Sequence, residues 1–162
     1  MKLFIISTII LCTLSGLAQS SEKSFVASPD YFIDSLSQKE NISAATLQSF
    51  NKMFTNVEKP KWHSTYEGST IKFERDNIKY HVFYNKKGKW KATIKYLPFE
   101  MLPKWVVGRV RSEFRNFSIF FAQHVKTPVG ATYLVKIEKS NNWKFVRISP
   151  EATEVLGEYV RN

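Results

Sequence analysis

The sequence has very little of what catalytic and disulfide-stabilised proteins are usually built from. It contains one cysteine in 162 residues and six glycines, no two of which lie close together. A single thiol excludes a disulfide framework, and isolated glycines do not form a phosphate-binding loop. The nucleophile motif G-x-S-x-G and the metalloprotease motif H-E-x-x-H are both absent. The sequence therefore predicts no catalytic residue and no cofactor.

Histidine and aspartate are also scarce. The three histidines, His63, His81 and His124, are far apart in the sequence, and Asp76 is the only aspartate after residue 43. Metal sites are usually recognised by His, Cys or acidic residues at short fixed spacings, which this chain does not have. We therefore expect no metal, and we rank an uncharacterised hydrolase last among the functions considered.

Long apolar runs are missing, apart from one short run at the N-terminus. Lys2 precedes the apolar residues 3–12, and Gly16 and Ala18 then stand at the minus-three and minus-one positions before Gln19. This layout predicts a signal peptide over residues 1–18. The alternative is an N-terminal anchor, but the run is short for a span of about 20 residues. We expect an exported protein, periplasmic or extracellular, with no transmembrane span after cleavage.

The hydrophobic pattern changes twice after the signal peptide. Residues 19–42 are mostly polar and predict a flexible arm. Ser43 is a good N-cap for a short helix whose apolar face carries Leu47, Phe50 and Phe54. Beyond Pro60 the period becomes two, which predicts antiparallel strands with one buried face. We place these strands near residues 62–66, 71–74, 80–84 and 90–96.

The same order of elements then recurs. Pro103 fits the start of a second helix, with Val106 and Val110 on its apolar stripe. Strands are predicted near residues 118–125, 132–138 and 143–148, and the last ends near 159. Phe50 and Phe114 occupy corresponding places 64 residues apart. The sequence predicts an α+β fold of two tandem repeats, about 43–97 and 98–159, each a helix followed by a four-stranded antiparallel meander. The helices would cover one face of the sheet.

A set of aromatic, glycine and proline positions connects the chain with a known family. The sequence resembles the beta-lactamase-inhibitor-like (BLIP-like), PepSY-like proteins, small exported proteins of Gram-negative bacteria. The resemblance covers roughly residues 44–159 and implies the same two-repeat fold, an envelope or extracellular location and a non-catalytic binding or inhibitory role. It rests on Phe50-x-x-x-Phe54, Trp62, Tyr80-x-Val82-x-Tyr84-x-x-x-Gly88-x-Trp90, Leu102-Pro103-x-x-Val106 and Tyr133-x-Val135.

Positive charge is the most informative surface feature of the sequence. Lysine and arginine number 24 against 14 acidic residues, a net charge of +10. If Ile71, Phe73, Val82, Tyr84, Ala92 and Ile94 face the first helix, their neighbours form an open, basic and aromatic sheet face. Adding the turn after residue 85 and the off-stripe Trp105, the predicted partner-binding residues are Lys72, His81, Phe83, Lys86, Lys87, Lys89, Lys91, Lys95, Trp105, Phe145 and Arg147.

Two binding functions fit such a face. One is docking of another envelope or secreted protein, as an inhibitor or a chaperone, through the sheet face and the turn. The other is attachment to an anionic glycan or lipid surface by charge. Export argues against nucleic acid as the ligand. A third, structural interpretation is that the lysines only keep the sheet soluble and block edge pairing.

Overall fold

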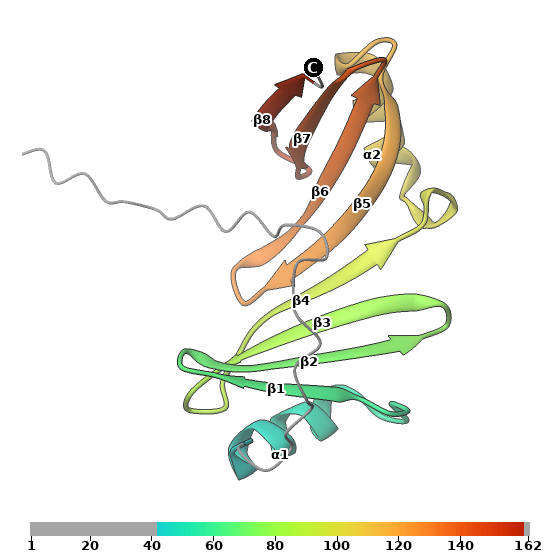
Figure 1. Cartoon of the computed structure of the whole chain (residues 1–162). Helices are drawn as coiled ribbons and strands as arrows, with labels where there is room; N and C mark the ends of the chain where they lie inside the picture. Colours follow the sequence, from blue (N-terminus) through green and yellow to red (C-terminus); the bar gives the residue numbers. More distant parts are fainter. Residues whose placement is uncertain (1–41, 161–162) are drawn as a thin grey trace, which may run out of the picture. The chain divides into compact units, whose positions relative to one another are not determined.

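A computed structural model describes residues 42–160 of the chain (Figure 1). The predicted signal peptide and nearly all of the predicted arm lie outside these residues. Each of two helices is followed by four strands, and a 3₁₀ turn, η2, joins the halves. The elements are α1 Ala44–Met53, β1 Lys61–Thr65, β2 Gly68–Arg75, β3 Ile78–Asn85, β4 Trp90–Leu97, η2 Phe99–Met101, α2 Lys104–Glu113, β5 Ser118–Thr127, β6 Gly130–Lys139, β7 Asn142–Ile148 and β8 Thr153–Val160.

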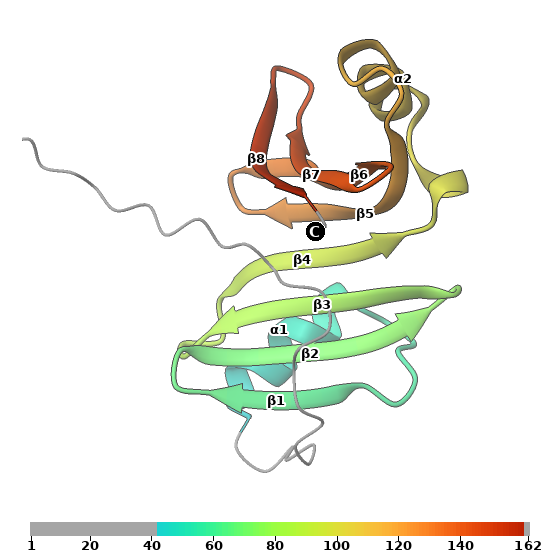
Figure 2. The same ribbon diagram turned by 45° about the horizontal axis from the view of Figure 1, so that its top comes forward.

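The eight strands form one sheet in sequence order, β1 to β8, and every neighbouring pair is antiparallel (Figures 1 and 2). Such a meander needs only short connections, and the polar turns predicted between the strands supply them. The predicted α+β fold with an antiparallel sheet is confirmed. The description of its halves as sequence repeats stays a prediction.

Helix α1 covers the first half of the sheet. Its N-cap is Ser43, as predicted, whose side-chain oxygen accepts a hydrogen bond from the Thr46 backbone nitrogen at 3.2 Å. Phe50 is 2% exposed, and its ring lies 5.0 Å from that of Trp62 and 5.7 Å from that of Phe73. These edge-to-face contacts are the favoured geometry for aromatic rings, so they anchor the helix to β1 and β2.

Helix α2 covers the second half with a smaller, aliphatic core. Pro103 stands at its N-cap, and Val106 and Val110 are buried on its inner side. They pack in one cluster with Val135 of β6 and Val146 of β7. Between residues 42 and 160, no helix is long and apolar enough to span a membrane.

Both helices lie on the same face of the sheet. The pairing registers place Tyr80, Lys95, His124, Tyr133 and Ile148 in one row across β3 to β7. Tyr80 belongs to the core beneath α1 and Ile148 to the core beneath α2. We call this side the helix face and the opposite side the outer face. The prediction that helices cover one face of the sheet agrees with this register.

Two glycines give a matched test of this packing. Gly88, in the β3–β4 turn, has a φ of +72°, and a Cβ there would lie 2.7 Å from the Ala45 backbone. Gly88→Ala should destabilise the fold by about 3 kcal/mol, through backbone strain and displacement of α1. Gly108 of α2 has nothing within 4 Å, so Gly108→Ala should stabilise the fold by up to about 1 kcal/mol. Denaturant unfolding measures both, and equal effects would contradict this packing.

Candidate functional site

The residues predicted to bind a partner fall into four places on the fold. Lys72, His81 and Phe83 lie on the outer face of β2 and β3, as predicted, and Phe145 and Arg147 lie on the outer face of β7. Strands are about 4.8 Å apart, so about 19 Å of sheet separates β3 from β7. The two groups therefore do not form one patch. The turn lysines occupy the third place, and Lys95 and Trp105 both lie on the helix face, the fourth.

In strand β4, several side chains lie on the opposite face of the sheet from the one predicted. A register shift lets Tyr84 pair with Trp90, whereas Phe83 pairs with Ala92 and His81 with Ile94. The extra residue of a β-bulge moves every later side chain to the other face. Trp90 therefore reaches the first core, as predicted, but Ala92 and Ile94 lie on the outer face, where Ile94 is nevertheless buried at 3% exposure. The expectation for those two residues was wrong.

The same bulge corrects the placement of two lysines. Lys95 pairs with Tyr80 and His124, so it lies on the helix face and not on the outer face. Lys91 is the extra residue of the bulge, and its side chain is exposed. The sequence shows unbroken alternation from residue 89 to 96, so it contains no local signal for the shift.

The β3–β4 turn gathers four of the predicted lysines. Asn85 shapes it, because its side-chain oxygen accepts hydrogen bonds from the backbone nitrogens of Lys87 at 3.0 Å and Lys89 at 2.9 Å. Lys86 places its Nζ 3.6 Å from the centre of the Tyr66 ring. All four lysines of this basic turn are exposed, and none forms an ion pair with the residues described: Lys86, Lys87, Lys89 and Lys91.

Trp105 lies on the helix face, away from Phe145 and Arg147. It is 41% exposed, and its ring packs edge-on against Tyr133 at 5.6 Å. Tyr133 in turn contacts the His124 ring at 4.8 Å. Trp105 is thus a half-exposed wall of the strip between the two cores, where the middle of β4 and β5 carries Lys95 and His124.

Five aromatic side chains gather on the outer face of β5 to β8. The centres of contacting rings lie between 4.0 Å apart, for the stacked pair Trp143 and Tyr159, and 6.5 Å apart, for Phe145 and Tyr159. Lys136 stands among them, with its Nζ 4.5 Å from the Phe120 ring and 4.7 Å from the Trp143 ring. We call this set the aromatic patch: Phe120, Phe121, Trp143, Phe145, Tyr159 and Lys136.

The aromatic patch depends on a second bulge. Ile119 pairs with Ile137 but Phe121 pairs with Lys136, so Phe120 is an extra residue. Both phenylalanines then project from the outer face, and Phe120 is 60% exposed. Of the patch, the sequence analysis identified only Phe145. The consecutive phenylalanines were a signal, but a regular strand would have placed them on opposite faces.

The described residues hold no cluster that could bind a metal ion. No three histidine, cysteine, aspartate or glutamate side chains between residues 42 and 160 gather as a metal site requires. Arg147 is held in an ion pair with Glu154, and Lys144 with Glu158 at 2.9 Å. Glu158 accepts hydrogen bonds from Asn142 and Lys144, which lower the pKa of its carboxyl group. The outer face offers recognition chemistry: an aromatic surface, the cation of Lys136 and the ion pair of Arg147 with Glu154.

Solved structures share this architecture. A DUF2874 family protein from Bacteroides ovatus superposes with a TM-score of 0.63 at 17% identity, over 75% of this chain and 89% of that chain. A BLIP-like protein from Bacteroides fragilis gives 0.62 at 19% identity, over 74% and 86%. A Bacteroides eggerthii protein, provisionally described as periplasmic, gives 0.61 at 14%, over 74% and 88%.

Identities this low show the fold alone. The structure thus supports the BLIP-like part of the predicted resemblance, and the PepSY-like part stays a prediction. No protein-family model and no curated protein matches the sequence.

The strip between the cores carries a pH-sensitive group. Burial, followed by the charges of Lys95 and Lys126, lowers the pKa of His124 below its ordinary 6.5. The folded protein then binds this proton less readily than the unfolded chain, so stability is lost as pH falls below about 6.5. We expect the thermal midpoint to drop between about pH 7 and pH 5, and to drop less in His124→Gln.

Titration of the His124 ring by NMR checks the cause directly. The expected apparent pKa lies below 6.5, and Lys126→Gln should raise it because one repelling charge is gone. A value at or above 6.5 would contradict the assignment.

Proposed function

We propose that this chain is an exported, non-catalytic binding module that docks another envelope or secreted protein through its aromatic patch. The observation that carries the proposal is the patch itself, where Phe120 and Tyr159 remain 60% and 46% exposed. Protein interfaces concentrate binding energy in aromatic and cationic side chains that a partner desolvates. Lys136 already stands between two rings, and covering it would strengthen both cation–π contacts.

The remaining predicted contact residues divide between this proposal and others. Phe145 is a member of the aromatic patch, and Arg147 borders it. Lys72, His81 and Phe83 already take part in other interactions, so the proposal does not rest on them. Export is supported by the predicted signal peptide and by the Bacteroides eggerthii likeness. An inhibitory role, as in the name BLIP-like, is the finer form of the proposal.

The proposal predicts which substitutions weaken binding of the partner protein and which do not. Phe120→Ala and Tyr159→Ala should each weaken partner binding about 30-fold or more, the effect of removing an interface hot spot of about 2 kcal/mol. Tyr66→Ala is the control, because Tyr66 is 87% exposed on the β1–β2 turn, away from the patch. The measurement is capture from the envelope fraction of the source organism, followed by a titration with the captured protein.

Two outcomes of this experiment would contradict docking at the aromatic patch. If Tyr66→Ala loses the partner as strongly as Phe120→Ala, or if neither patch variant loses it, the partner does not bind the aromatic patch. Circular dichroism and unfolding of each variant show that the fold is unchanged, which is expected because both side chains are largely exposed.

The basic turn favours a second candidate, binding to an anionic glycan or lipid surface. Replacing Lys86, Lys87, Lys89 and Lys91 by Gln should abolish such binding and leave protein docking intact. Raising NaCl from about 0.05 M to about 0.5 M should weaken it steeply, because exposed charges are screened over a few ångströms at high salt. Binding to anionic vesicles, compared with neutral ones, gives the readout. Unchanged binding by the fourfold variant would remove this candidate.

A further inference from the structure

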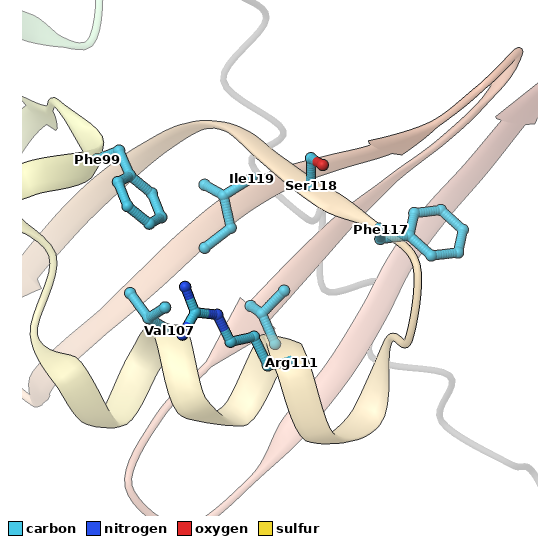
Figure 3. A pocket seen from close by; sticks show the side chains of 7 residues that line it. Phe99, Val107, Arg111, Phe117, Ser118 and Ile119 are labelled. Atoms are coloured by element: carbon cyan, nitrogen blue, oxygen red, sulfur yellow. The ribbon is translucent and has the colours of Figure 1, made fainter.

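A pocket of about 350 Å³ lies beside α2, on the helix face and away from the aromatic patch. Three elements meet there: η2, the side of α2 that carries Val107 and Arg111, and the first residues of β5 (Figure 3). Figure 3 shows the Phe99 and Ile119 side chains on one side and Val107 and Arg111 on the other, facing a common space. The pocket is lined by Phe99, Val107, Val110, Arg111, Phe117, Ser118 and Ile119.

The lining combines apolar side chains with one charged side chain, Arg111. Arg111 stands four residues after Val107, and helix side chains lean toward the N-terminus, so its guanidinium extends back past Val107 (Figure 3). Within residues 42–160 it forms no ion pair, although Arg109 on the same helix pairs with Glu113. Five of the seven lining residues are aliphatic or aromatic, the usual composition of a small-molecule site.

We propose that this pocket binds a carboxylate that carries an apolar chain. A guanidinium matches the two oxygens of a carboxylate in a bidentate pair, and a single cation matches a single negative charge. At about 30 Å³ per water-sized group, the volume accommodates roughly ten such groups. That suits a medium-length fatty acid or the final apolar residue of a peptide with its terminal carboxylate.

Probes that differ in one feature test the proposal. Decanoate has both the charge and the chain, decanol lacks the charge, and acetate lacks the chain. On the full chain, decanoate should shift the amide NMR signals of Ser118 and Ile119, with binding at least tenfold tighter than that of decanol. Acetate should leave both signals unchanged. If decanoate causes no shift below its micelle-forming concentration, or binds no better than decanol, the proposal fails.

Two variants and a control separate the pocket from general charge attraction. Arg111→Gln should weaken decanoate binding about tenfold, the worth of one charge-assisted pair. Val107→Trp should also weaken it, because the larger side chain fills the space and leaves the charge in place. Arg115→Gln removes the same charge just after α2, outside the pocket, and should change nothing. Equal losses in Arg111→Gln and Arg115→Gln would overturn the site.

A peptide probe distinguishes between the two sources of the carboxylate, a fatty acid and the C-terminus of a peptide. A tetrapeptide ending in phenylalanine is compared with its C-terminal amide and with decanoate. Tighter binding of the free acid than of either other probe assigns the pocket to peptide C-termini, and tighter binding of decanoate assigns it to fatty acids. This proposal is independent of docking at the aromatic patch, so either can fail while the other holds.

Discussion

The architecture follows from how little sheet a short helix can cover. Eight strands at about 4.8 Å spacing span about 34 Å, whereas a helix with its side chains is about 10–12 Å wide. Two helices therefore leave part of the helix face bare, and the bare part is the middle of β4 and β5, at Lys95 and His124. The side chains change character there. Beneath the helices lie Phe73 and Ile148, both buried, but between them the row continues through Lys95 and His124.

The two cores beneath the helices also differ in composition. Below α1, aromatic rings fill the space between helix and sheet, with Phe50 at their centre. Below α2, the core is built from valine and isoleucine, and α2 carries an exposed Gly108. Smaller side chains fill less volume, which leaves room for the pocket at the edge of α2. The aromatic core thus lies in the first half, and the pocket beside α2 lies in the aliphatic half.

The sequence predicted elements better than it predicted faces. Alternation identified the strands, because a half-buried antiparallel strand must alternate, and Ser43 marked the start of α1. Alternation does not show where a strand gains one extra residue, since that depends on the partner strand's register. The helix-face position of Lys95 and the outward position of Ile94 both result from such a shift. The aromatic patch was missed for the same reason, because its members come from four strands whose pairing only the fold defines.

A single residue in β5 explains why the recognition surfaces lie on opposite sides of this strand. Downstream of the bulge, Ala122 belongs to the core on the helix face and Phe121 to the outer face. Without an extra residue, strict alternation would then turn Phe120 toward the helix face and Ile119 outward. The bulge restores Ile119 to the helix face, where it lines the pocket, and keeps Phe120 in the aromatic patch. The pocket and the patch therefore share one backbone irregularity, and neither would have its present lining if β5 were regular.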